Sequence, residues 1–106
     1  MNRQPAVAGT FYPENPIQLH QMLDQYLNDA ESSEKVPKAI IAPHAGYIYS
    51  GPVAATAYAR LKKAHDRITR VVIIGPSHRV AFRGLALSKA ESFITPLGAI
   101  AIDQEA

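Results

Sequence analysis

Two histidines stand at equivalent places in two similar stretches of the sequence. His44 directly follows the mostly apolar run at 39–43, and His78 follows the apolar run at 71–74 after a Gly-Pro-Ser turn. Short, continuous apolar runs predict buried β-strands. Because two neutral imidazoles at one point suit zinc, iron or copper, His44 and His78 are the first candidates for chemistry in this chain.

The elements between the histidines explain how they would meet. Residues 52–64 carry apolar side chains at helical spacing, so the pattern predicts a strand, a helix and a second strand. This βαβ order requires a parallel pair of strands with a right-handed crossover. The carboxyl ends of both strands then lie at one sheet edge, about 4.8 Å apart, where open α/β sheets bind ligands.

The remaining segments complete an α/β fold with a mostly parallel sheet and flanking helices. Residues 1–16 contain three prolines and predict an extended, irregular arm. Asn15 and Pro16 are a typical helix start, and that helix should reach about residue 30. Further strands are expected at 84–88 and 98–103, with an irregular stretch at 91–97 between them.

The predicted helices are too few to cover both faces of the predicted sheet. A parallel sheet needs helices on both faces, and the sequence predicts only two helices, with the last expected strand close to the end of the chain. We therefore expect a domain, residues 1–106, that is incomplete at its C-terminus, or one that another chain covers. An exposed strand edge would favour self-association.

Two histidines are too few for a complete metal site. Catalytic zinc uses three protein ligands, and non-haem iron oxygenases use two histidines and a carboxylate. Asp103, Glu14 and His20 are candidates for the third ligand by residue type alone.

Other polar side chains near the histidines could have functional or purely structural roles. Tyr47 and Tyr49 either orient a substrate or pack against the core helix. Ser77 lacks the glycine pattern of a nucleophile elbow, so it is expected to bond the loop or a ligand. Arg79 and Arg83 either hold an anion near the site or are solvated.

Composition excludes several classes of protein. The net charge of +2 comes without a concentrated basic run, so nucleic-acid binding is not expected. No stretch approaches the roughly 20 apolar residues of a membrane helix. The chain has no cysteine, no phosphate-binding glycine loop and no apolar signal-peptide core. These features predict a soluble, cytoplasmic protein.

Four motifs resemble, in the same order, those of the Memo family: AGTFYP at 8–13, IAPHAGYIYSG at 41–51, GPSH at 75–78 and TPLG at 95–98. That family is similar in fold to class III extradiol non-haem iron dioxygenases. The resemblance implies that His44 and His78 are metal ligands, with iron(II) as the first choice and copper or zinc as alternatives. It also implies a radical-SAM protein as a partner.

The resulting functional prediction is a metal-binding, dioxygenase-like redox protein acting on a small aromatic substrate. Tyr47, Tyr49, Ser77 and Arg79 would then support the ligands or contact the substrate. The alternative is a scaffold that binds peptides, phosphopeptides or anions without turnover, using Arg79, Arg83 and the tyrosines. A metal-dependent hydrolase that uses a bound water is a third option.

Overall fold

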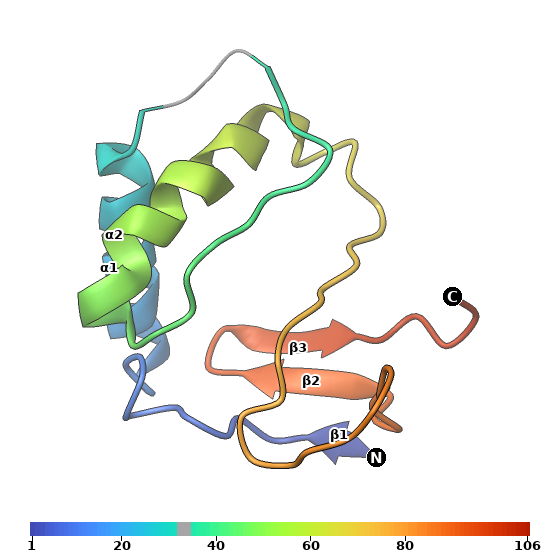
Figure 1. The fold of residues 1–106 in the computed structure, drawn as a ribbon. Helices are drawn as coiled ribbons and strands as arrows, with labels where there is room; N and C mark the ends of the chain where they lie inside the picture. The colour runs from blue at the N-terminus through green and yellow to red at the C-terminus, as the bar shows by residue number, and fades with distance from the viewer. Residues whose placement is uncertain (32–34) are drawn as a thin grey trace.

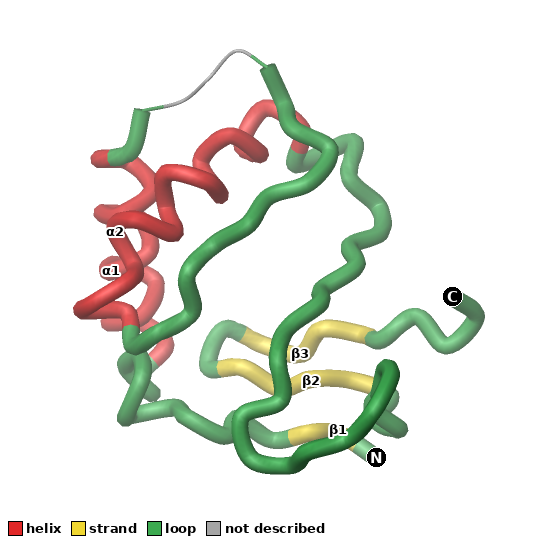
Figure 2. Tube along the Cα trace, viewed as in Figure 1, coloured by secondary structure: helices red, strands yellow, loops and turns green. Residues whose placement is uncertain are grey.

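The computed structural model describes residues 1–31 and 35–106 and contains a helical layer beside a small sheet (Figure 1). Helix α1 (Pro16–Asp29) packs against α2 (Tyr47–Tyr58), which continues as the 3-10 helix η1 (Ala59–Ala64). The sheet consists of β1 (Asn2–Arg3), β2 (Ser92–Thr95) and β3 (Gly98–Ala101) in the order β1-β2-β3. Long loops connect the two layers (Figure 2).

The sheet is mixed, and it is built from the two ends of the chain. Strand β1 pairs in parallel with β2, with Asn2 opposite Ser92, and β2 pairs antiparallel with β3. Residues 1–16, expected to be irregular, therefore supply one strand. Residues 91–97, also expected to be irregular, supply β2, and the expected strand at 98–103 is found as β3.

The turn between β2 and β3 explains why residues 92–101 form a hairpin. Pro96 fixes its own φ, and Gly98 adopts a φ of 131°, which side chains rarely tolerate. The Thr95 hydroxyl donates to the Gly98 carbonyl at 3.0 Å and accepts from the Leu97 N–H at 3.1 Å. These bonds bring the two strands into register. Pro96 therefore ends β2 but does not prevent β2 from forming.

The prediction of a mostly parallel βαβ sheet is wrong for this structure. Residues 39–42 (the first apolar segment) and 71–74 (the second apolar segment) are not strands, and neither is the stretch at 84–88. Within the described parts of the chain, neither apolar segment makes a backbone–backbone hydrogen bond. An apolar run favours a strand only as a local preference, because a strand also needs a neighbouring strand to pair with.

The first helix follows its sequence signals closely. The Asn15 side chain accepts hydrogen bonds from the N–H groups of Ile17 and Gln18 at 2.9 and 3.1 Å, and Pro16 occupies the first turn. Both features satisfy or remove N–H groups that have no partner within the helix. The predicted helix from Pro16 to about residue 30 is confirmed.

The second helix begins at Tyr47 rather than at 52, so its predicted start was wrong. Gly46 is the N-cap, and its carbonyl accepts from the N–H groups of Tyr49 and Ser50 at 2.9 and 3.0 Å. Pro52 lies inside the helix. As the sixth residue of α2, it lacks the N–H that would bond within the helix, but the first turn at 47–50 lies ahead of it and forms without that bond. Ser50 lies in the first turn of the helix, is buried, and donates to the Ala45 carbonyl at 2.9 Å.

The buried core is small, and most of it lies in the helical layer. Leu19 is the largest of the buried apolar side chains, and the others are alanines: Ala55, Ala59, Ala64 and Ala90. The helices approach closely at Gly51, where an added Cβ would lie 2.5 Å from Cε2 of Tyr26. None of the helices in the described ranges is long and apolar enough to cross a membrane.

Candidate metal centre

His44 and His78 meet in the structure, as their matching positions predict. Their Nε2 atoms lie 3.1 Å apart, and the ring centroids are separated by 5.2 Å with an interplanar angle of 47°. Each histidine follows the carboxyl end of one apolar segment. The convergence therefore occurs although no strand ladder joins the two segments.

The spacing of the two nitrogens suits a shared cation. Two nitrogens bound at about 2.1 Å to one ion lie about 3.0 Å apart at a right angle and about 3.4 Å apart at the tetrahedral angle. The observed 3.1 Å falls between these values. Without a cation, one Nε2 must carry a proton and donate it to the other. Both side chains are exposed, so the pair is open to solvent ions.

Two of the three candidates for a third ligand, Asp103 and His20, have other partners. Asp103 forms an ion pair with Arg70, in which Nε of Arg70 lies 3.1 Å from Oδ2 of Asp103. His20 faces Asp24 one helical turn along α1, at 3.0 Å. Glu14 lies against Gly9 in the N-terminal arm. Across residues 1–31 and 35–106, no group of three or more metal-binding side chains is assembled.

Tyr47 connects the start of α2 to the N-terminal arm. Its N–H donates to the Phe11 carbonyl at 2.8 Å, and its ring lies 5.3 Å from that of Tyr12 at a 42° tilt. Burial raises the pKa of the Tyr47 phenol, and the nearby phenols of Tyr12 and Tyr58 raise it further. Tyr47 therefore stays a neutral hydrogen-bond donor well into the alkaline range.

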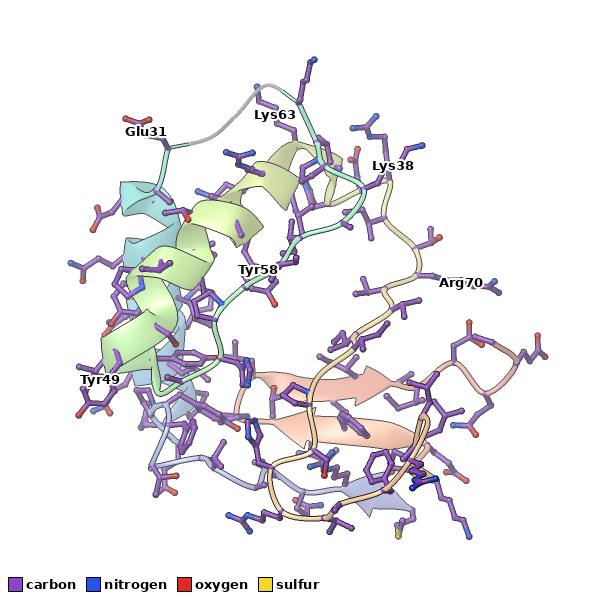
Figure 3. All side chains as sticks on the ribbon, in the orientation of Figure 1. Glu31, Lys38, Tyr49, Tyr58, Lys63 and Arg70 are labelled. Carbon is purple, nitrogen blue, oxygen red and sulfur yellow. The ribbon has the colours of Figure 1, made fainter. Side chains whose placement is uncertain are left out.

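Tyr49, Ser77 and Arg79 are exposed at the surface. Tyr49 is 84% exposed and points away from the rest of the molecule (Figure 3). The Ser77 hydroxyl donates to the Val80 carbonyl, so it closes the loop that carries His78. Arg79 and Arg83 are both exposed.

A cleft of about 470 Å³ opens between α1, α2 and the N-terminal arm, and His44 is one of its lining residues. Its walls are mostly apolar and aromatic. The lining residues are Val7, Phe11, Tyr12, Leu23, Tyr26, Leu27, Pro43, His44, Tyr47, Ser50, Gly51, Ala54, Ala55 and Tyr58. This volume is within the range of small-molecule sites.

Tyr26 and Tyr58 line the cleft but were not predicted to do so, although the sequence carries a signal for Tyr58. From Tyr47 to Tyr58, the α2 residues that line the cleft recur every three or four positions, which places them on one helix face. The predicted later start of α2 left Tyr47 outside the helix, so this face was not recognised.

Comparison with known proteins adds the family context. A family model described as "Memo-like protein" matches residues 3–106. A "MEMO1 family protein" of Aquifex aeolicus is 41% identical over 104 residues, covering 97% of this chain and 37% of that protein. The protein named "Protein MEMO1" is 44% identical to this chain in Xenopus tropicalis and 40% identical in Homo sapiens. Each match spans 103 residues, which is 97% of this chain and 34% of the relative. The chain thus spans about a third of the length of these curated relatives.

Proposed function

Because the chain belongs to the Memo family, with a family model matching almost its whole length, we propose that it binds a divalent transition metal through His44 and His78. Iron(II) is the first choice of metal, and copper or zinc are the alternatives. The observation that supports this most directly is the 3.1 Å separation of the two Nε2 atoms. In this proposal both imidazoles carry their proton on Nδ1, which leaves each Nε2 lone pair free for the ion.

The proposed reaction is oxygen chemistry on a small aromatic substrate, as in the dioxygenases whose fold the family is similar to. A bound iron ion would supply open coordination positions for substrate and oxygen. The cleft beside His44 would hold an aromatic ring among Phe11, Tyr12 and Tyr47. Since its pKa is raised, Tyr47 would donate a hydrogen bond to the substrate rather than act as a base.

The test of metal binding is an anaerobic iron(II) titration followed by calorimetry. The chain should bind one ion, and His44→Ala or His78→Ala should weaken binding at least tenfold. His20→Ala and His65→Ala are matched controls, since both histidines lie outside the pair, and should bind as the parent does. Binding that survives loss of both His44 and His78, or no binding by the parent, contradicts the proposal.

A second measurement separates the enzyme from the scaffold alternative. An iron-dependent enzyme should consume oxygen when a catechol is added. A scaffold should bind an anionic peptide equally with and without metal, and lose affinity when Arg79 and Arg83 are changed to alanine. Metal-independent peptide binding without oxygen uptake would replace the enzyme proposal with the scaffold.

Two predictions concern the setting of this protein. We propose a cytoplasmic location and a radical-SAM protein as its partner, both carried over from the sequence and the family resemblance. Copurification of a tagged chain from its source cells, followed by identification of bound proteins, tests the partner. A tagged chain recovered without any radical-SAM protein counts against it.

A further inference from the structure

The cleft beside His44 gathers most of the tyrosines of this chain. Four of the five line it: Tyr12 in the N-terminal arm, Tyr26 on α1, and Tyr47 and Tyr58 on α2. The four rings come from three separate elements, so phenols border the cleft on more than one side.

The hydroxyls of these four tyrosines have no protein partner within the described residues. None of the hydrogen bonds between those residues involves a phenol oxygen, and none of the four oxygens is fully buried. The Ser50 hydroxyl, which also lines the cleft, already donates to the Ala45 carbonyl at 2.9 Å. Small-molecule sites combine apolar walls with a few such polar groups that orient the ligand. In this cleft the phenol hydroxyls are the groups available for that role.

Three of the phenols lie close to one another. Burial is the main cause of the raised pKa of Tyr47, and the phenols of Tyr12 and Tyr58 add to it because their oxygens lie near its own. A phenol is a strong hydrogen-bond donor and a weak acceptor, since its oxygen lone pair is delocalised into the ring. The cluster therefore presents O–H donors that are best satisfied by an acceptor on the ligand.

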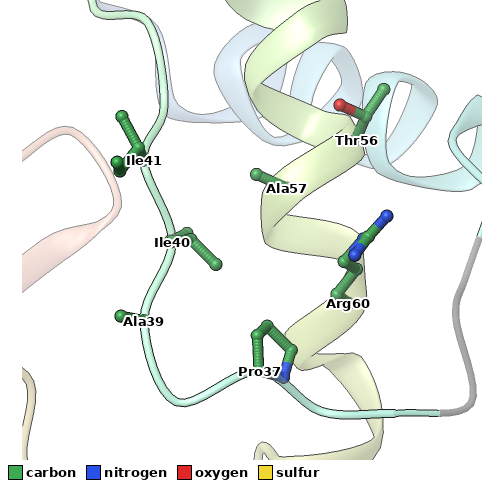
Figure 4. A pocket seen from close by; sticks show the side chains of 7 residues that line it. All are labelled: Pro37, Ala39, Ile40, Ile41, Thr56, Ala57 and Arg60. Carbon is green, nitrogen blue, oxygen red and sulfur yellow. The ribbon is translucent and has the colours of Figure 1, made fainter.

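The cleft carries no full charge with which to hold an anion or a cation. Among its described lining residues there is no Asp, Glu, Lys or Arg, and Nε2 of His44 faces that of His78. Because burying an unpaired charge is costly, a neutral ligand fits best. The smaller cavity of about 250 Å³ between residues 37–41 and the α2–η1 helix differs, because Arg60 lines it (Figure 4). The two cavities share no lining residue.

We propose that the tyrosine-lined cleft binds a quinone, a neutral planar ring whose carbonyl oxygens accept hydrogen bonds from the surrounding phenols. A 1,4-quinone carries two carbonyls on opposite edges of its ring, so it can reach hydroxyls on two walls at once. Its ring packs against Phe11 and the tyrosine rings, and the volume of about 470 Å³ admits a molecule of this size. The inference rests on the proposed function for the use of this cleft as the ligand site, and it names the class of aromatic compound held there.

The corresponding hydroquinone or catechol fits the same hydroxyls less well. Its own O–H groups are donors, so each of them needs a phenol oxygen of the cleft to act as an acceptor, which is the weaker role of a phenol. The metal-free chain should therefore prefer the oxidised, carbonyl form of a given ring system.

Calorimetric titration of the metal-free chain with four matched compounds tests this inference. They are 1,4-naphthoquinone, naphthalene without oxygens, the anion 1-naphthoate, and 1,4-dihydroxynaphthalene under anaerobic conditions. The quinone should bind one to one, and the other three at least tenfold more weakly. The chain has no cysteine, so no thiol reacts with the quinone.

Each contrary result overturns the inference in a different way. Equal binding of naphthalene would leave only an apolar fit, and equal binding of the dihydroxy compound would remove the preference for carbonyls. Tighter binding of naphthoate would make the chain an anion binder, and Arg60→Ala would show whether the anion occupies the smaller cavity. No binding of the quinone would reject the site altogether.

Phenylalanine variants locate the ligand. Tyr47→Phe and Tyr58→Phe should each weaken naphthoquinone binding about threefold to tenfold, because each removes one donor and keeps the ring. The lost hydroxyls have no protein partner in the described chain, so the far-UV circular dichroism should stay unchanged. Tyr49→Phe is the matched control, since Tyr49 is 84% exposed and does not line the cleft. Equal weakening by all three variants would contradict binding in the cleft.

The quinone titration and the iron(II) titration fail separately. A chain that binds naphthoquinone but no iron would reject the metal site and keep this inference. A chain that binds iron at the His44–His78 pair but no naphthoquinone would keep the metal site and overturn this inference.

Discussion

Helix α1 and the two apolar segments were predicted from equally clear sequence patterns, yet only α1 has its expected form. Helix α1 satisfies its backbone within fourteen residues and receives its cap from Asn15. The apolar segments cannot bond their own backbones, because strand hydrogen bonds come from another strand. The comparison teaches that a local pattern suffices for a helix, whereas a strand also depends on chain elsewhere.

The largest expected effect on stability comes from replacing the buried Leu19, compared with replacing the exposed Ile73. Leu19→Ala should lower the free energy of unfolding by about 2–5 kcal/mol, because Leu19 is 4% exposed and its truncation removes buried apolar contacts and leaves a cavity. Ile73→Ala in the exposed second segment should change it by less than about 0.5 kcal/mol. Urea titrations followed by circular dichroism measure both. Comparable losses would show that the second segment is packed within the isolated chain.

Glycine substitutions sharpen the same contrast. Gly51→Val should cost about 2 kcal/mol, since an added Cβ would lie 2.5 Å from the Tyr26 ring, where α1 and α2 meet. Gly75→Val follows the second segment and meets nothing within 4 Å, so it should be nearly neutral. Thermal unfolding of the two variants compares them. An unchanged melting temperature for Gly51→Val would argue against close packing of the helices.

The smallest effect concerns pH and Tyr47. Its pKa is raised above 10.0 in the folded chain, so the folded state holds the phenol proton more tightly than the unfolded state does. The resulting stability is complete below pH 10 and is lost as the pH rises through the folded pKa. Tyr47→Phe should therefore lose less stability above pH 10 than the parent.

Tyr49→Phe is the control for this measurement, because Tyr49 is 84% exposed. Melting temperatures between pH 8 and 11 compare the three proteins, and absorbance titration follows phenolate formation. A Tyr47→Phe profile identical to that of the parent would show that burial of this phenol does not contribute to the pH dependence.

The predicted proximity of His44 and His78 was right although one step of its reasoning was wrong, and metal binding by the pair stays a prediction. The sequence placed His44 and His78 after two similar apolar runs, and the structure brings their Nε2 atoms to 3.1 Å. The predicted reason was adjacent strands in a parallel sheet, which the structure does not contain. The two imidazoles meet although no backbone ladder joins the two apolar segments within the described residues.

By itself, the sequence determined what depends on neighbours along the chain: the α1 cap at Asn15 and Pro16, the apolar preference of both segments, the histidine positions and the family motifs. Tertiary structure decided the pairing of β1 with β2, because strand partners far apart in sequence carry no local signal. It also decided the tyrosine-lined cleft, which exists only where α1, α2 and the arm approach one another. The two apolar segments lie between these cases, since their strand preference is local and their pairing requires a partner strand.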